Sequence, residues 1–595
     1  MPSFQIPTKD KKFIQTNKSD LFGNLFSTWN LDFDSSQGKV KVSSGMMVRT
    51  NSTDDADLGN PMAFVRSSAD GTDRWWALCG AVLFKNTAGA SPISSAFVQD
   101  AIASSPTTLT AISSDMVDFN GALIVSTSTE LYRLSTTWNA TWWTGTLAQS
   151  ALTASIAHPL HVSIKTNNLL IGDGNKLHTV DINSNVRSSR VILPTEFEII
   201  WIRSSYDGVW VGARNKFMRD AQVFYWDESA ENYNRGYGLK HFMTFAGIIK
   251  NGICHTINGV GQLLKFNGSG FEEVAVLPIF NQINKRWTDG NSVLRNICRN
   301  GMDIIQDKIH INVCSEINNA LASFMGNFPG GIWVYDEQQG LRHKYGISQF
   351  NISSFGTSGQ EVDYGAMRID AAGAIVQIDA NSGVLLAGAT ITTNATTTLN
   401  VISFVEQNQS VDNRGHFVSS VFESSSFEDI YKEILLSFKR FRNSGDRIII
   451  KYKNNKSTNY PVAAAITWSD TNTFTTTTDI PNAVVGDEVM VIKGKGSGAT
   501  AHISAISAAG GTYTVDLDES ITGVTGTAQV IINNFKKAAT ISTQGIDRES
   551  FDLDVPGTFL QLKVELRTKP AGVSGFGDTP ELEKIIVNSS TDEVI

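Results

Sequence analysis

Histidine is the side chain that most often performs acid–base chemistry near neutral pH, and two of the nine histidines, His158 and His161, stand close together. A zinc-dependent hydrolase would carry H-E-x-x-H on a helix. This H-x-x-H segment contains a proline and has no helical pattern around it. We therefore expect both histidines to be loop or strand-end residues.

Glycine-rich strings offer two further motifs to test. A serine hydrolase needs G-x-S-x-G between a strand and a helix, and neither Gly268-Ser269-Gly270 nor Gly496-Ser497-Gly498 has that spacing. Residues 494–499, GKGSGA, resemble a phosphate loop, but a strand-like HISAI follows from His502. Without a helix N-terminus there is no phosphate site, so the sequence predicts a tight β-turn.

Acidic residues could serve glycoside hydrolysis or calcium binding. Residues 68–75, SADGTDRW, and 205–210, SYDGVW, come close to the Asp box of sialidase-type propellers, but both are misspaced. An Asp box is itself a structural turn, and hydrolysis would also need a placed pair of carboxylates. Three acidic clusters lack the D-x-D-x-D-G pattern with a distal glutamate, so we expect solvated turns rather than a calcium site. They are Asp54-Asp55-Asp57, Asp115-Asp118-Asn120 and Asp516-Asp518-Glu519. We expect no catalytic residue, no metal and no cofactor.

One cationic run stands out in the C-terminal third. Strand alternation would place part of it on one sheet face, which could meet an acidic partner or passing DNA. A solvated face, or a sheet edge protected by lysines, explains the same residues. The run consists of Lys439, Arg440, Arg442, Arg447, Lys451, Lys453 and Lys456.

The elements that position these residues read as β-structure. With 595 residues the chain is long enough for three or four domains, and only 18% of the residues are charged, so uncharged polar residues must cover much of the surface. A net charge of −9 does not support wrapping nucleic acid as the main function.

Four irregularly spaced cysteines favour reduced, buried thiols. No stretch approaches about 18 uninterrupted apolar residues, so we expect no membrane-spanning segment and a protein folded in a reducing cytoplasm.

A weak internal repeat indicates the fold of the N-terminal two thirds. An apolar strand, a turn with Gly or Asn, and a second strand ending in an aromatic or apolar residue recur about every 40 to 50 residues. The positions we take as equivalent are Phe84, Tyr132, His178, Tyr225, Phe266, Tyr335 and Ile378. One long interval is consistent with an insertion around residues 286–299. Such a period is typical of β-propeller blades and predicts six or seven of them, with β-sandwiches or a β-solenoid as the competing architectures.

The pattern changes after about residue 400. Residues 433–453 read as two strands around the turn at 443–446, which predicts a hairpin with Ile448, Ile450 and Tyr452 on one face. Residues 559–568 and 582–587 add strands to a C-terminal β-sandwich. Short strands separated by glycine turns predict a small barrel inserted into it. The expected domains are an N-terminal arm at 1–60, a propeller at 61–395, a sandwich at 396–465 and 536–595, and the barrel at 466–535.

Several segments resemble structural proteins of tailed-bacteriophage tails. The opening LFGNLFSTWNLDFDSSQGKVKVSSG, from Leu21, resembles the segment that introduces the propeller in such proteins. Residues 484–506 are similar to small β-modules of phage virions, and residues 427–453 and 579–587 are similar to their sandwich strands. The resemblance covers about a quarter of the chain and rests on no single diagnostic motif.

The resemblance implies a non-enzymatic virion protein of the tail, assembled in the host cytoplasm. It would be a nozzle or tail-tip hub that forms a ring of identical copies, such as a hexamer, around the DNA exit channel and takes part in attachment and genome ejection. Its partners would be adaptor and fibre proteins and the passing phage DNA. The alternative is a receptor- or carbohydrate-binding propeller of the adsorption apparatus that uses Trp and Tyr at loop tips; a glycan depolymerase would require convergent acidic residues in the propeller funnel.

Overall fold

The computed structural model describes the chain from Ser3 to Thr591 with gaps. Segments of three or more residues outside the description are 7–24, 33–38, 44–46, 49–59, 90–96, 100–112, 140–151, 278–296, 315–329, 347–367, 380–383, 393–397, 406–413, 424–428, 442–444, 455–461, 494–498, 568–579 and 592–595. The secondary structure in the described part is all β, which confirms the expected class. No helix there is long and apolar enough to cross a membrane.

Seven four-stranded antiparallel sheets follow one another along the described residues of the first two thirds of the chain. Sheet 1 contains β6 (Pro61–Ser67), β7 (Arg74–Cys79), β8 (Val82–Asn86) and β9 (Phe97–Gln99). Sheet 2 contains β10 (Ser113–Phe119), β11 (Ala122–Thr127), β12 (Leu131–Ser135) and β13 (Thr137–Asn139). Sheet 3 contains β14 (Leu160–Val162), β15 (Leu169–Asp173), β16 (Lys176–Val180) and β17 (Val186–Ile192). Sheet 4 contains β18 (Phe197–Ser204), β19 (Val209–Asn215), β20 (Gln222–Trp226) and β21 (Arg235–Gly238).

The next two sheets repeat this order and the seventh departs from it. Sheet 5 contains β22 (Thr244–Lys250), β23 (Ile253–Asn258), β24 (Gln262–Phe266) and β25 (Phe271–Val276). Sheet 6 contains β26 (Met302–Ile305), β27 (Lys308–Val313), β28 (Gly331–Asp336) and β29 (Gly340–Tyr345). Sheet 7 contains β30 (Arg368–Asp379), β31 (Val384–Thr392), β32 (Thr398–Val405) and, from the N-terminal arm, β5 (Met47–Val48). The domain boundary expected at residue 395 therefore falls before β32, which pairs with β31.

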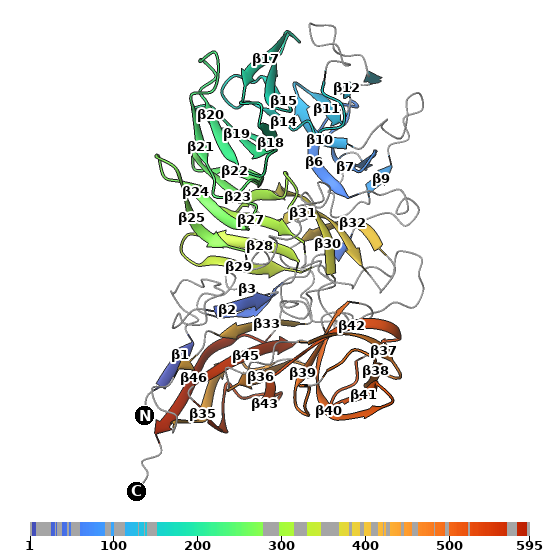
Figure 1. Cartoon of the computed structure of the whole chain (residues 1–595), viewed down its shortest axis with the longest axis vertical. Coiled ribbons are helices and arrows are strands. Elements are labelled where there is room, and N and C mark those ends of the chain that lie inside the picture. Colours follow the sequence, from blue (N-terminus) through green and yellow to red (C-terminus); the bar gives the residue numbers. More distant parts are fainter. Residues whose placement is uncertain are drawn as a thin grey trace.

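The seven sheets close into a propeller-like ring. The first strand of each sheet contacts the first strand of the next, in the order β6, β10, β14, β18, β22, β26 and β30, and β30 returns to β6. Figure 1 shows these sheets fanned around a common centre. Each sheet buries its faces against its neighbours, which is why strands such as β15 and β19 are apolar over nearly their whole length.

Glycines in the strands permit the close packing of sheets 4 and 5. Trp201 is fully buried, and its indole Nε1 donates to Thr244 Oγ1 at 2.9 Å. A Cβ at Gly212 would lie 2.0 Å from the Trp201 ring, and a Cβ at Gly247 would lie 2.5 Å from it. Only glycine fits at these two positions, because the indole occupies the space that a side chain would take.

The repeat found in the sequence corresponds to the third strand of each sheet. Six of the seven equivalent positions, Phe84, Tyr132, His178, Tyr225, Phe266 and Tyr335, lie in β8, β12, β16, β20, β24 and β28. Ile378 lies instead in β30, the first strand of sheet 7. Its equivalence was wrong because the third strand of sheet 7 is β32, which begins only at Thr398. Most of the expected insertion at 286–299 lies outside the described residues.

Two further sheets face each other below the ring. Sheet A has the order β1 (Ser3–Ile6), β46 (Leu582–Thr591), β35 (Asp429–Phe438) and β44 (Arg548–Pro556). Sheet B has the order β2 (Leu25–Trp29), β33 (Arg414–Ser419), β45 (Phe559–Arg567), β36 (Arg447–Lys453) and β43 (Lys536–Ile541), with β34 (Phe422–Glu423) also on β45. Alternate residues of both sheets share one apolar core, for example Ile434 of β35 with Ile448 and Ile450 of β36.

The hairpin predicted at residues 433–453 was wrong. β35 pairs with β44 and β46 in sheet A, whereas β36 pairs with β43 and β45 in sheet B. The turn between them is a crossing from one sheet to the other. Both strands have one apolar face, and these faces bury more surface by meeting across a shared core than by lying side by side.

A closed barrel is inserted between β36 and β43. Its strand order is β37 (Val462–Trp468), β38 (Thr473–Thr476), β41 (Thr512–Leu517), β40 (Thr500–Ala509), β39 (Glu488–Lys493) and β42 (Gly526–Asn533), and β42 returns to β37. It has its own apolar core, which includes Phe474, Val489, Val515 and Val530. The sequence placed the inserted unit at 466–535, and the barrel strands run from Val462 to Asn533.

The N-terminal arm joins the two halves of the molecule. β1 pairs with β46 of sheet A, β2 pairs with β33 of sheet B, and β5 pairs with β32 of sheet 7. Between them, β3 (Leu31–Asp32) and β4 (Lys41–Val42) form a short ladder whose Leu31 and Val42 enter the core shared by sheets A and B. In Figure 1 the blue strands β2 and β3 lie between the ring and the C-terminal sheets, and β1 lies beside the red β46.

Candidate functional site

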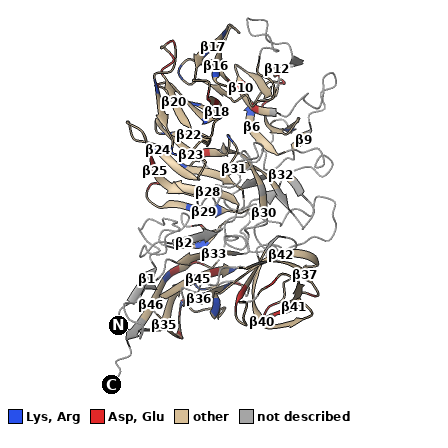
Figure 2. Ribbon diagram, in the orientation of Figure 1, with Lys and Arg blue, Asp and Glu red and all other residues tan. Residues whose placement is uncertain are grey.

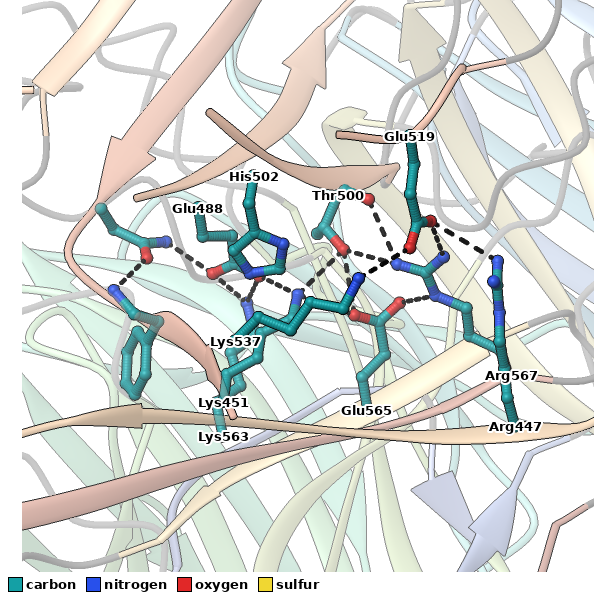
Figure 3. A network of polar contacts seen from close by, with 12 residues as sticks. Arg447, Lys451, Glu488, Thr500, His502, Glu519, Lys537, Lys563, Glu565 and Arg567 are labelled. Atoms are coloured by element: carbon teal, nitrogen blue, oxygen red, sulfur yellow. Dashed lines mark hydrogen bonds and ion pairs between the residues drawn. The ribbon is translucent and has the colours of Figure 1, made fainter. Parts of the chain in front are cut away.

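The densest cluster of charged side chains in the described residues lies between sheet B and the barrel (Figures 2 and 3). In β36 and β45, alternate residues point into the core of the two sheets, and the intervening residues point toward the barrel. Across the two strands Lys451 is paired with Lys563, and Arg447 is paired with Arg567. Like charges directly opposite each other destabilise a sheet, so this face needs anions from elsewhere.

The barrel supplies one of those anions from the first residue of β39. Glu488 Oε1 accepts from Lys451 Nζ at 2.5 Å, and both of its oxygens accept from Lys563 Nζ at 2.8 Å. Asn533 of β42 also donates to Glu488 Oε2 at 2.9 Å. One carboxylate therefore bridges the two opposed lysines and accepts hydrogen bonds at both of its oxygens.

A second carboxylate bridges the two arginines. Glu519, which follows β41, accepts from Arg567 Nη1 at 3.0 Å and lies 3.6 Å from Arg447 Nη2. Lys537 of sheet B lies 3.3 Å from both Glu519 and Asp518. Asp518 in turn accepts from the backbone N–H of His502 at 2.7 Å.

Glu565 of sheet B links the two halves of the network. It accepts from Lys451 Nζ at 3.0 Å, from Arg567 Nε at 2.5 Å and from Thr500 Oγ1 at 2.9 Å. Thr500 begins β40, and it also accepts from Arg567 Nη2 through Oγ1. Barrel and sheet are thus joined by a continuous chain of charge-assisted hydrogen bonds.

Burial makes this arrangement strongly interdependent. Lys451 and Glu488 are fully buried, and Lys563, Glu565 and Arg567 are nearly so. Burial acts to raise the pKa of Glu488, but Lys451 and Lys563 outweigh it and hold that pKa well below its usual range. Burial likewise opposes ionisation of Glu519, and Arg567 and Arg447 lower its pKa. The carboxylates are ionised at neutral pH and bind the cations of sheet B.

The structure divides the cationic run found in the sequence. Lys451 is buried in the network, so it is not part of an exposed cationic surface, and Arg447 lies at the edge of the network. Lys439 contacts Glu581 at 2.8 Å, and the exposed Arg440 lies 3.5 Å from Asp547. Burial lowers the pKa of Lys453. Arg442 and Lys456 lie outside the described residues.

Four other members of the network were not predicted from the sequence. Residues 563, 565 and 567 alternate as Lys, Glu and Arg along β45, a period-two signal for one polar strand face. Glu488 stands at the start of a barrel strand, where its role depends on a partner 37 residues away. Nothing local in the sequence marks that pairing.

A second polar cluster lies at the centre of the ring. Asn300 Nδ2 donates to Asp115 Oδ1 of β10 at 2.7 Å and to the carbonyl of Met62 in β6 at 3.2 Å. Its carbonyl accepts from Ile375 of β30, and Arg203 of β18 donates to its Oδ1 at 3.1 Å. Residues 297–301 therefore contact the innermost strands of four sheets.

The arginine next to Asn300 is buried with unsatisfied donors. Arg299 is 2% exposed, and its Nε and Nη1 have no hydrogen-bond partner. Burial lowers the pKa of the neighbouring Arg203 and raises that of Asp303. Asp115 also accepts from the backbone N–H of Leu160 at 2.9 Å. The cluster binds neighbouring sheets together at the ring axis.

The two histidines of the H-x-x-H segment also serve packing. His158 Nδ1 contacts the carbonyl of Gly172 at 3.1 Å, and His161 Nε2 accepts from the backbone N–H of Ser204 at 3.1 Å. Burial lowers the pKa of His161 to about 3. His158 lies before β14, as predicted for a loop or strand-end residue, whereas His161 is the middle residue of that three-residue strand.

The acidic clusters are occupied by protein donors where they are described. Besides Asp115, Asp118 accepts from Ser67 Oγ and Asp516 accepts from Thr473 Oγ1. The cluster at 54–57 lies outside the description. Among the described residues no three His, Cys, Asp or Glu side chains are grouped to hold a metal ion. All four cysteines are buried, and none of them forms a disulfide bond.

No family model and no curated protein matches this sequence. Among solved structures, the chain is similar to the extracellular domain of a hybrid two-component system from B. thetaiotaomicron, with a TM-score of 0.39 and 12% identity. That match covers 73% of this chain and 46% of the other, so this chain spans less than half of that protein's length. The Dos1 propeller matches with a TM-score of 0.33 and 10% identity over 63% of this chain and 92% of its own. A chain of the mitotic checkpoint complex matches with a TM-score of 0.35 and 10% identity over 63% of this chain and 98% of its own.

Proposed function

We propose that the seven sheets of the ring are the blades of a seven-bladed propeller and that sheets A and B form a β-sandwich carrying the barrel. The closed order of first-strand contacts supports the propeller. β5 completes sheet 7 from the other end of the chain, a closure that ties the first and last blades together. The core shared by sheets A and B supports the sandwich.

We propose further that the protein is a structural component of a bacteriophage tail, a nozzle or tail-tip ring that forms or closes the DNA exit channel. The observation that carries this proposal is the N-terminal arm, which adds strands to sheets A, B and 7. Strand pairing, rather than a linker, thus couples propeller and sandwich. Such coupling suits a tail protein that transmits force from its contact with the receptor to the parts that release the genome.

The buried network supports the same role. The carboxylates of the network accept hydrogen bonds from cations and hydroxyls of the protein itself. The network thereby fixes the barrel to sheet B. Protein occupies the centre of the ring, so DNA would not pass through it. Because residues 297–301 lie across the axis of the propeller, the exit channel would run between subunits and not through the propeller of one subunit.

The experiment that tests this proposal locates the protein in the particle. Phage particles carrying a C-terminal tag on this chain would be labelled with gold-conjugated antibody and imaged by electron microscopy. Label on the tail axis is the expected result. Label confined to fibre tips, together with glycan binding by isolated monomers, would contradict the channel role and favour a receptor- or carbohydrate-binding propeller.

A further inference from the structure

Exposed apolar side chains are concentrated on two neighbouring sheets of the ring. Of the nine large apolar residues exposed in the described part of the chain, six belong to sheets 3 and 4. They are Ile164, Ile182, Ile192, Tyr206, Phe217 and Met218, with exposed fractions from 48% to 82%. Apolar side chains gathered in this way are typical of protein–protein contact surfaces.

Five of the six lie in turns, and the turns fall on opposite faces of the ring. Ile164, Ile182 and Tyr206 lie in the turns after β14, β16 and β18, which we call face 1. Lys165, in the turn after β14, joins it to the turns after β18 and β20, since its Nζ donates to the carbonyls of Asp207 and Asp227 at 3.3 and 2.8 Å. The turn after β19 lies at the other end of the strands and carries Phe217 and Met218.

The turn on this opposite face, which we call face 2, is held in shape from inside. Asn215 Oδ1 accepts from the backbone N–H of Phe217 at 2.9 Å. The carbonyl of Asn215 accepts from the backbone N–H of Met218 at 3.2 Å. The backbone N–H of Lys216 donates to the carbonyl of Glu196 at 2.8 Å. Met218 adopts a φ of 56°, which costs energy for an L-residue. An ordered turn thus presents two adjacent apolar side chains to solvent.

The turns on the two faces differ in the sign of their net charge, and three arginines on adjoining strands offset part of the negative charge of face 1. The turns of face 1 carry five carboxylates and one lysine, Lys165; Arg187, Arg190 and Arg235 lie on the adjoining strands β17 and β21. The carboxylates are those of Asp181, Asp207, Asp227, Glu228 and Glu231. Face 2 carries four cations against Glu196 and Asp220. These cations are Lys176, Lys216, Arg219 and Lys240.

We propose that face 2 of one copy docks on face 1 of the next copy, with Phe217 and Met218 contacting Ile164, Ile182 and Tyr206. Each copy then uses two different surfaces, so the contact is heterologous and can close into a ring. The inference rests on the proposed ring and names its interface. Apolar anchors flanked by complementary charge are what such an interface requires.

The first test removes the anchors of one face at a time. Phe217→Ser with Met218→Asn alters face 2, and asparagine tolerates the positive φ at 218. Ile182→Ser with Tyr206→Ser alters face 1. Because all four side chains are largely exposed, both variants should fold. In sedimentation equilibrium each should associate at least about tenfold more weakly than the unaltered protein. Val484→Ser with Val485→Ser, exposed on the barrel, is the matched control and should assemble normally.

The second test combines the two variants. A heterologous contact leaves one intact interface between a chain altered on face 1 and a chain altered on face 2. Their mixture should therefore form dimers, although each variant alone stays monomeric. In the same way, Arg219→Glu with Lys240→Glu should weaken association, and adding Asp207→Lys with Glu231→Lys to the same chain should restore it.

The outcomes separate this interface from the proposed function. If the unaltered protein forms rings and both anchor variants do so equally well, the interface is refuted and the ring stands. If the unaltered protein remains monomeric up to the highest concentration reached and gold labelling is absent from the tail axis, both proposals are refuted. Dimers from the mixture alone would support the interface directly.

Discussion

Cations stand directly opposite cations in sheet B, and the barrel makes this arrangement stable. Lys451 faces Lys563, and Glu488 accepts hydrogen bonds from both. A buried network of this kind costs desolvation of every charge, and that cost is offset only while each member keeps its partners. We infer that the network fixes the position of the barrel, because the apolar cores on either side do not merge.

Replacing Glu488 by glutamine should therefore strongly destabilise the protein. The change keeps the shape of the side chain but leaves two buried lysines facing each other, at a cost of about 3–5 kcal/mol in the free energy of unfolding. Urea unfolding followed by tryptophan fluorescence would measure it. Glu519→Gln is the matched control; its side chain is 26% exposed, so the loss should be about 1 kcal/mol or less. Equal losses for the two variants would contradict this account.

Three histidines of the ring should make its stability depend on pH. Burial lowers the pKa of His161 to about 3 and those of His255 and His343 to about 4. An unfolded histidine titrates near 6.5, so below that pH the unfolded chain binds protons that the folded ring does not, and stability falls. The stabilisation is complete above about pH 6.5 and is lost progressively toward pH 3.

Between pH 7 and pH 5 each of these histidines should cost up to roughly 2 kcal/mol of stability. Calorimetric melting at the two pH values measures the sum. His161→Gln should reduce the difference, because glutamine does not titrate and can still accept from the backbone N–H of Ser204. A melting temperature that is the same at pH 5 and pH 7 would show that these histidines do not titrate differently on folding.

At the scale of elements, the repeat could be recognised in the sequence because every sheet of the ring packs against its neighbours in the same way. Phe84, Tyr132 and Tyr335 recur because the third strand of each sheet carries a large side chain into the contact between sheets. The equivalence of Ile378 was wrong, since this residue lies in the first strand of sheet 7 and the third strand is β32. The pairing of β35 with β36 was predicted wrongly. Alternating apolar and polar residues indicate which face of a strand is buried, but not which strand pairs with it.

Removing the N-terminal arm should destabilise both halves of the molecule. Deleting residues 1–50 removes β1 to β5 and leaves unpaired edges on sheets A, B and 7. We expect calorimetric transitions lower by at least about 4 °C. Deleting residues 1–8 removes β1 alone and should lower only the melting temperature of the domain formed by sheets A and B. An unchanged ring transition in the longer deletion would refute a closing role for β5.

The segment at the ring centre gives another element-scale prediction. Asn300→Ala removes side-chain hydrogen bonds to three sheets and should cost about 1–3 kcal/mol in thermal unfolding. Asn300→Asp would replace the amide that donates to Asp115 by a second carboxylate, so it should cost more stability than Asn300→Ala. An aspartate variant as stable as the unaltered protein would show that the Asn300 amide does not donate to Asp115.

For the whole molecule, composition and periodicity sufficed to predict an all-β chain and an inserted unit after residue 460. They could not show that Lys451 of the cationic run is buried, because its partners Glu488 and Glu565 follow 37 and 114 residues later. Nor could they show the threading of the arm, since β5 spans only Met47–Val48 and its partner strand β32 begins at Thr398. Long-range pairing of this kind leaves no local signal.

The central claim is that copies of this chain form a closed ring. Electron microscopy of the purified, full-length protein tests it most directly, through class averages recorded over a range of concentrations. The account predicts closed rings in which each subunit shows a propeller and a smaller C-terminal body, with the channel between subunits. Monomers at every concentration, or assemblies in which the channel runs through the propeller of a single subunit, would contradict it.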